Sequence, residues 1–239
     1  MTSKLLENKV ILVTGASRGI GRSVAIAAAK EGAELLITGR TTGALEEVDD
    51  EINEAGGSAV IIEMDQTDLE AIPRLASAIA SRWGRLDGFV ANAGQLGQLS
   101  PMPHQDTETW DRTLLVNLTS QFHMIKAFDP LLRASDAGRA VLVSSGAAVG
   151  VRPFWGAYAV SKAGLEAMGR AWAGESEQTN MKINMIDPGG TRTAMRAAAF
   201  PGEDPATLPT GDDIAPAFIT LLSEECPYHG ALVKARDLI

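Results

Sequence analysis

The residues with the clearest chemical potential in this sequence are Tyr158 and Lys162, which lie four positions apart in a stretch of helical composition. Residues at this spacing share one face of a helix, about one turn apart. A free tyrosine has a pKa of about 10 and is a poor acid–base catalyst near neutrality, but a neighbouring ammonium favours the phenolate and lowers that pKa. The pair therefore predicts a tyrosine that donates or accepts a proton.

Ser144 and Ser145 stand at the end of a short aliphatic run upstream of this pair. Serine is depleted in strands, so two serines at this point ask for a reason. Open α/β sheets bind their ligands at the carboxyl ends of the strands. The position therefore predicts that the serine hydroxyls belong to a ligand site.

A glycine-rich turn follows the first aliphatic run of the chain. Gly15, Gly19 and Gly21 lie between that run and an alanine-rich stretch of helical composition. Glycines at such a junction let the backbone approach a pyrophosphate, whose charge is met by the free N–H groups and the dipole of the helix. Glycines also serve plain turns, and here the strand–turn–helix context favours a phosphate loop.

These residues must be positioned by the short aliphatic runs and the helical stretches that alternate along the chain. The runs are short enough to be strands buried on both faces, and the alternation implies right-handed crossovers between parallel strands. We expect an α/β fold, a doubly wound (Rossmann) parallel sheet of about seven strands with helices on both faces, in a single domain over residues 1–239. The expected strands are Val10–Thr14, Leu35–Thr38, Ala59–Glu63, Phe89–Ala91, Ala140–Ser144, Ile183–Ile186 and Ala231–Val233, and the expected helices include Gly21–Lys30, Leu45–Ala55, Leu69–Trp83, Glu108–Phe128 and Tyr158–Glu177.

Composition excludes several classes of protein. With 239 residues, 45% hydrophobic and 21% charged, the chain is ordinary globular material, and its net charge of −9 has the wrong sign for a nucleic-acid binder. Cys226 is the single cysteine, and three scattered histidines offer no metal-ligand spacing. The longest apolar run, Val24–Ala29, is too short for a membrane helix, and residues 1–9 lack the apolar core of a signal peptide. We expect a cytoplasmic protein with no metal, no membrane and no nucleic acid as partner.

The glycine spacing at residues 15–21, together with Asn92-Ala93-Gly94 after the fourth expected strand, resembles the compact branch of the short-chain dehydrogenase/reductase family. Ser145 precedes Tyr158 by the family's interval, and Asn117 matches the family's helix asparagine. Pro188-Gly189 after the sixth expected strand extends the match. The resemblance implies an oxidoreductase with a catalytic tetrad of Asn117, Ser145, Tyr158 and Lys162.

The resemblance also implies a role for each member of this tetrad. Tyr158 would exchange a proton with the substrate oxygen, and Ser145 would stabilise the charge that develops there. Lys162 would bind the nicotinamide ribose and depress the tyrosine pKa, while Asn117 would hold a water that links Lys162 to solvent. The alternative is that a buried tyrosine, a capping serine and a surface lysine meet by accident.

The end of the second expected strand bears on the cofactor. Relatives that use NAD place there a carboxylate, which holds the adenosine ribose, whereas this chain has Gly39 followed by Arg40, with Arg18 inside the glycine-rich turn. Guanidinium groups bind phosphate bidentately, so the two arginines predict NADP(H); the alternative is that both are solvated surface. The cofactor-binding set that the resemblance implies is Gly15, Ser17, Arg18, Gly19, Ile20, Gly21, Arg40, Asp65, Asn92, Ala93, Gly94, Tyr158, Lys162, Pro188, Gly189, Thr191 and Thr193.

Side chains expected around the nicotinamide must recognise the substrate, and we assign Gln95, Ala147, Phe154, Trp155 and Met195 to this role. Their mostly small, aromatic or aliphatic character indicates a mainly apolar carbonyl or secondary alcohol. Phe154 and Trp155 could instead form a hydrophobic staple at a helix start. The proline-containing segment 190–209 is expected to be a lid over the nicotinamide, ordered by ligand.

Two features depart from the family pattern. Asp187 replaces the asparagine that commonly precedes Pro188-Gly189, and we assign it no role. Residues 229–236 replace the usual tail, which in the family often contributes to a subunit interface. We expect a homo-oligomer, and a dimer and a tetramer both remain open.

Together these observations predict an NADP-dependent short-chain dehydrogenase/reductase (EC 1.1.1.-), a carbonyl reductase of small molecules. One alternative is an NADP(H)-binding regulatory protein without turnover, although such proteins typically lose the tyrosine or the lysine. Another is a 3-oxoacyl thioester reductase, whose carrier protein would require a basic docking face. The helix after Tyr158 carries Glu166, Glu175 and Glu177 against Lys162 and Arg170, which disfavours that partner.

Overall fold

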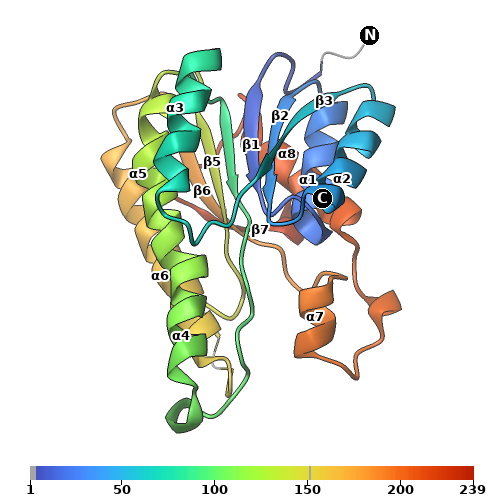
Figure 1. Ribbon diagram of the computed structural model, residues 1–239, viewed down its shortest axis with the longest axis vertical. Coiled ribbons are helices and arrows are strands. Elements are labelled where there is room, and N and C mark those ends of the chain that lie inside the picture. The colour runs from blue at the N-terminus through green and yellow to red at the C-terminus, as the bar shows by residue number, and fades with distance from the viewer. Residues whose placement is uncertain (1–3, 151) are drawn as a thin grey trace.

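Seven parallel strands form one sheet, in the order β3-β2-β1-β4-β5-β6-β7, in the computed structural model, which describes residues 4–150 and 152–239 (Figure 1). β1 pairs with β2 on one side and with β4 on the other, so the strand order reverses beside β1. Doubly wound sheets bind ligands outside such a switch point. The strands are β1 Val10–Thr14, β2 Glu34–Gly39, β3 Ser58–Glu63, β4 Gly88–Ala91, β5 Arg139–Val143, β6 Lys182–Asp187 and β7 Leu232–Lys234.

Helices cover both faces of the sheet (Figure 1). On one face α1 Gly19–Lys30, α2 Thr42–Glu54 and α8 Gly211–Leu222 bury Val24, Leu45 and Phe218 against the strands. On the other face α3 Ala71–Trp83, α5 Ser120–Arg133 and α6 Gly156–Glu175 bury a second cluster, in which the rings of Phe89 and Phe128 lie 5.3 Å apart. The two remaining helices, α4 Thr107–Leu114 and α7 Ala194–Ala199, lie beyond the carboxyl ends of the strands (Figure 1).

The predicted α/β fold, with a doubly wound sheet of seven strands, is confirmed, and three local expectations need correction. The expected helix Glu108–Phe128 is two helices, α4 and α5, joined by a π-helical turn at Leu115–Thr119. The strand expected over Ala140–Ser144 ends at Val143, which leaves Ser144 in the following loop. Helix α8 was not among the expected helices, although its start carries the Thr210-x-x-Asp213 pattern of a helix N-terminus.

The unusual C-terminal tail supplies the last strand. β7 pairs in parallel with β6, and His229 attaches the preceding turn by accepting a hydrogen bond from Ile183 N at 3.2 Å. Its other ring nitrogen lies 2.9 Å from Ala173 O on α6. Within residues 4–150 and 152–239, no helix is long and apolar enough to cross a membrane, and no group of three candidate metal ligands occurs. Assembly as a dimer or tetramer stays a prediction.

The capping box at the start of α8 gives a test of local stability. The Thr210 side chain accepts a hydrogen bond from Asp213 N, and the Asp213 carboxylate accepts one from Thr210 N. Thr210→Ala removes the first of these bonds and should lower the free energy of unfolding by about 1 kcal/mol, measured by urea denaturation. Thr41, the residue before α2, makes no such bond, so Thr41→Ala is the matched control. Equal losses in the two variants would contradict a stabilising role for the capping box.

Candidate active site

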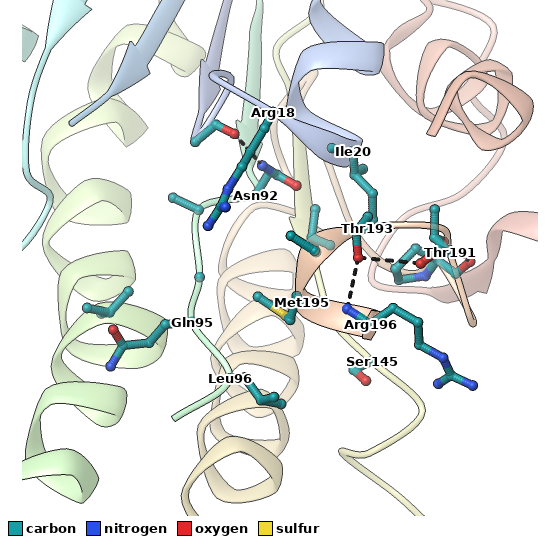
Figure 2. A pocket seen from close by; sticks show the side chains of 18 of the residues that line it. Arg18, Ile20, Asn92, Gln95, Leu96, Ser145, Thr191, Thr193, Met195 and Arg196 are labelled. Carbon is teal, nitrogen blue, oxygen red and sulfur yellow. Dashed lines mark hydrogen bonds between the residues drawn. The ribbon is translucent and has the colours of Figure 1, made fainter. Parts of the chain in front are cut away.

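A cavity of about 490 Å³ opens at the carboxyl ends of the strands beside the switch point. Figure 2 shows Arg18, Ile20 and Asn92 at one end of this cavity and Leu96 and Ser145 at the other. It is lined by most of the predicted site residues, namely Gly15, Ser17, Arg18, Gly19, Ile20, Arg40, Asp65, Asn92, Ala93, Gly94, Gln95, Ser145, Trp155, Tyr158, Lys162, Pro188, Gly189, Thr191, Thr193 and Met195. Four predicted residues, Gly21, Asn117, Ala147 and Phe154, do not line it.

The glycine-rich turn between β1 and α1 has the shape of an anion cradle. Gly15 and Gly19 have φ values of +63° and +58°, which side chains rarely adopt. Gly21 packs behind the turn, where a Cβ atom would lie 2.4 Å from Gly15 O. Asn92 holds the turn from β4 by donating to Thr14 O at 2.9 Å and to Gly15 O at 3.1 Å. No side chain caps α1, so its first N–H groups are left for a ligand, and the turn fits a pyrophosphate.

Arg18 belongs to this turn, and Arg40 follows Gly39, where a Cβ atom would lie 3.3 Å from Ser17 Cβ of the same turn. In the ranges that the structure describes, neither guanidinium forms an ion pair with a carboxylate. Asp65 lines the cavity near them. Burial raises its pKa, but hydrogen bonds from Thr67 and the positive charges of Arg40 and Arg112 outweigh this and hold the pKa below its ordinary value. This end of the cavity therefore presents cations and one ionised carboxylate to a polar ligand.

The predicted proton-transfer group, Tyr158, lies where α6 meets the end of β5. Tyr158 is buried in the first turn of α6 and faces Ser145, which follows β5. Burial raises the pKa of the Tyr158 phenol, a hydrogen bond with Ser145 lowers it, and the charge of Asp187 raises it again. The net shift is upward, so the expected depression of this pKa by Lys162 is not found. Asp187, which had no assigned role, also accepts a hydrogen bond from Gly189 N at 3.0 Å.

The ammonium of Lys162 does not lower the pKa of Tyr158 because it is itself buried and donates to a backbone carbonyl. Nζ donates to Val143 O at 2.7 Å and lies 5.8 Å from the centre of the Tyr158 ring. Burial lowers the pKa of Lys162 from 10.5 to about 8, so the group still carries its charge at neutral pH. The spacing correctly predicted that Tyr158 and Lys162 lie close together. It could not show that burial raises the pKa of the phenol and lowers that of the ammonium.

Asn117 lies in the π-helical turn and is fully buried outside the cavity. Its side-chain oxygen accepts from Gln95 N at 2.8 Å, and its amide group donates to Gln95 O at 2.8 Å and to Ser161 Oγ at 3.0 Å. Both amide hydrogens of Asn117 are thus used by protein partners, and the expectation that Asn117 holds a water for Lys162 stays a prediction. π-Helical turns are frequent at functional sites, and this one places Asn117 between the Gln95 backbone and α6.

Two predicted substrate residues lie away from the cavity. Ala147 is buried but does not line it, and Phe154, whose backbone is left-handed (φ +75°), is 56% exposed. This exposure also excludes Phe154 as half of a hydrophobic staple. Trp155 lines the cavity instead, with its ring 5.6 Å from that of Tyr158 and 5.7 Å from that of Phe200. Ser144, whose hydroxyl was expected in a ligand site, also lines the cavity, as do Arg192, Ala194, Arg196 and Ala199 of the expected lid. The lining residues that no sequence pattern indicated are Thr38, Gly39, Met64, Gln66, Leu96, Val116 and Val143.

The expected lid, residues 190–209, contains α7 and is bonded to itself. Arg196 donates to both carboxylate oxygens of Glu203, each at 2.6 Å, and its guanidinium lies 3.9 Å from the centre of the Phe200 ring. Arg192 donates to Pro205 O at 2.7 Å and to Leu208 O at 3.3 Å. Met195 of α7 lines the cavity, as Figure 2 shows. Closure of this segment over a ligand stays a prediction.

A phosphate-binding turn and a buried tyrosine–lysine pair at the switch point of one doubly wound sheet are typical of dinucleotide-dependent oxidoreductases. The family model described as short chain dehydrogenase matches residues 9–204. The chain belongs to the short-chain dehydrogenase/reductase family and is an oxidoreductase of that family.

Individual relatives cover nearly the whole chain. The uncharacterised oxidoreductase YciK of Escherichia coli K12 is 42% identical over 92% of this chain and 88% of its own length. A short chain dehydrogenase from Escherichia coli CFT073, solved in complex with NADPH, superposes with a TM-score of 0.94 at 41% identity, covering 99% of this chain and 100% of that one. The hydroxynaphthalene reductase-like protein Arp2 of Metarhizium brunneum is 37% identical over 81% of this chain and 72% of its own length.

The burial of Lys162 should make the stability of the fold depend on pH. Between pH 10.5 and about 8 the unfolded chain binds the Lys162 proton while the folded protein does not. The free energy of unfolding should therefore rise with pH across this window, by about 2 kcal/mol between pH 7 and pH 9.5. Denaturant unfolding at these two pH values should show the rise in the wild type but not in Lys162→Met. Lys126→Met, on the exposed face of α5, should retain it, and an equal rise in all three proteins would rule out this effect of burial.

Proposed function

We propose that this protein interconverts a mainly apolar carbonyl compound and its secondary alcohol with NADP(H), using Tyr158 as the acid–base group. The observation that carries this proposal is the convergence, in one cavity, of Tyr158, Ser145 and Lys162 with the anion cradle at Gly15–Gly19. The cavity thus combines a proton-transfer group with a binding site for a dinucleotide.

The residues at the cradle fit NADP(H). The turn at Gly15–Gly19 and the start of α1 would hold the pyrophosphate, and Arg18 and Arg40 would bind the 2′-phosphate of the adenosine ribose. The complex of the Escherichia coli CFT073 relative with NADPH supports this assignment. Bound NADPH supplies a hydride to the carbonyl carbon, and the protein's part is to position the carbonyl and to protonate its oxygen.

With its pKa raised, the Tyr158 phenol carries its proton at neutral pH, so the proton for the carbonyl oxygen is in place. The phenol stays protonated until the substrate oxygen becomes basic, and it then transfers its proton to that oxygen. The Ser145 hydroxyl stabilises the charge that develops on the same oxygen. Lys162, whose ammonium donates to Val143 O, would bind the nicotinamide ribose. In the direction of alcohol oxidation, the phenolate takes the proton back.

The walls near Tyr158 favour an apolar substrate, and among these we favour an aromatic carbonyl. The Trp155 ring lies edge-on to Tyr158 and is backed by the ring of Phe200, which does not itself line the cavity. Leu96 and Met195 add aliphatic surface. Flat aromatic groups pack well against such rings. The similarity to a protein named hydroxynaphthalene reductase-like agrees with this choice.

Two alternatives are weaker. A regulatory protein without turnover would not need Tyr158 and Lys162 buried together against the end of β5. A carrier-bound 3-oxoacyl thioester would need a basic docking face near the site. Two of the charged residues of α6, Lys162 and Glu166, are buried and contribute nothing to a docking surface. The exposed charged residues on and directly after α6 are Arg170, Glu175 and Glu177, so this surface is acidic.

Preference for NADP(H) over NAD(H) should depend on Arg40. Arg40→Ala removes charged hydrogen bonds to the 2′-phosphate and should weaken NADPH binding by about 1.5–3 kcal/mol while NADH binding changes little. Fluorescence titration of both nucleotides measures the difference. Arg74→Ala, an exposed arginine outside the cavity, is the control. Equal affinity of the wild type for both nucleotides would remove the basis of this proposal.

Acid–base catalysis should depend on one of the two tyrosines in the chain, Tyr158 and Tyr228. Tyr158→Phe keeps the ring and should leave NADPH affinity unchanged, whereas turnover of an aromatic ketone should fall by about 10²–10⁴-fold. Tyr228→Phe, at a residue outside the cavity, should retain wild-type turnover. If Tyr158→Phe turns over at the wild-type rate, Tyr158 is not the acid–base group.

A further inference from the structure

The last residue of β5 and the two residues that follow it are each hydrogen-bonded to a different side chain of α6. Val143 O accepts from Lys162 Nζ, Ser145 hydrogen-bonds Tyr158, and between them Ser144 Oγ donates to Glu166 Oε1 at 2.6 Å. The α6 residues are spaced by four and lie on one face of the helix. Tyr158 and Lys162 already have roles in the proposed chemistry, whereas Glu166 has none assigned.

Glu166 is only 1% exposed, and a buried carboxylate is costly unless it is paired and hydrogen-bonded. Its two oxygens have separate partners, Ser144 Oγ on one side and Arg170 on the other at 3.4 Å. The bond to Ser144 is the shorter one and lies wholly in the interior, whereas the Arg170 side chain is 52% exposed. The orientation of the carboxylate is therefore tied to Ser144.

Ser144 is held from two sides. Its backbone N–H donates to Ile186 O on β6 at 2.7 Å, and its hydroxyl is bonded to Glu166 on α6. Because Ser145 follows directly, the backbone at Ser144 sets where the Ser145 side chain begins, and Ala147 N, which donates to Ser145 Oγ at 3.2 Å, helps to orient the hydroxyl. This gives a physical reason for a serine, rather than an apolar residue, at position 144.

We propose that Glu166 is a positioning residue, which acts through Ser144 to hold the Ser145 hydroxyl against Tyr158 and the substrate oxygen. The inference rests on the proposed function, since it assigns Glu166 a role in that reaction. What the position requires is a hydrogen-bond acceptor for Ser144 Oγ, and a negative charge is not required. Glutamine should therefore replace Glu166 and leucine should not.

Kinetics of the holoenzyme with NADPH and an aromatic ketone give the first test. Glu166→Leu and Ser144→Ala should each lower kcat by about 10- to 100-fold with little change in the KM for NADPH, as expected for a displaced catalytic group. Glu166→Gln should keep kcat within about two-fold, because Arg170 is exposed enough to move from the new amide. The double variant Glu166→Leu/Ser144→Ala should be no slower than either single variant. Glu175→Leu, an exposed glutamate on the same helix, is the matched control.

The pKa of Tyr158 gives a second test that needs no turnover, so it separates failure of this inference from failure of the proposed function. The groups that face Tyr158 are Ser145, Asp187 and Lys162, and of these only the bond with Ser145 lowers the pKa of Tyr158. In a Tyr228→Phe background, ¹³Cζ-tyrosine NMR reports Tyr158 alone. Glu166→Leu should raise its pKa as Ser145→Ala does, whereas Glu166→Gln should leave it at the wild-type value.

Two outcomes would overturn the proposal. One is a folded Glu166→Leu protein with wild-type kcat and an unchanged Tyr158 pKa. The other is a Glu166→Gln protein as impaired as Glu166→Leu, which would show that the charge and not the hydrogen bond matters. If Glu166→Leu does not fold, as judged by circular dichroism, Ser144→Ala decides, and wild-type values for that variant in both measurements contradict the proposal.

Discussion

The hydrogen bond from the buried Lys162 ammonium to Val143 O is the interaction on which the site depends. It places a positive charge in the interior, at the last residue of β5, and so fixes the position of α6 along that strand. The same placement sets the position of Tyr158 one turn earlier on the helix. Burial opposes the ionisation of both side chains: it raises the pKa of Tyr158 and lowers that of Lys162. The well-packed sheet around them stabilises the fold enough to keep both groups buried.

The rest of the cavity is held by contacts among neighbouring strand ends. Asn92 ties the glycine-rich turn to the end of β4, and Asn117 ties the Gln95 backbone to α6 through Ser161. Neither asparagine needs to touch a substrate in order to matter. Each satisfies buried backbone groups of the loops that surround the cavity, and such groups are costly to leave unpaired.

Much of the fold could be predicted because it follows from local pattern. Aliphatic runs become buried strands, and glycine spacing identifies the turn before α1. The shared helical face of Tyr158 and Lys162 is likewise a property of the sequence alone. What could not be predicted depends on tertiary packing. The outward ring of Phe154 follows from a left-handed backbone, the break between α4 and α5 from a π-helical turn, and the raised pKa of Tyr158 from burial by elements far away in the sequence.

The segment that carries α7 has a consequence for the thermodynamics of recognition. Its bonds between Arg196 and Glu203, and from Arg192 to two backbone carbonyls, order it internally before any ligand arrives. Gly189, with a φ of +72°, adjoins one end, and the capping box of α8 fixes the other. Because these bonds lie within the segment, they need not break when its position changes. Closure over a ligand would then move one bonded unit about its two ends, and it would cost less conformational entropy than ordering a free loop of the same length.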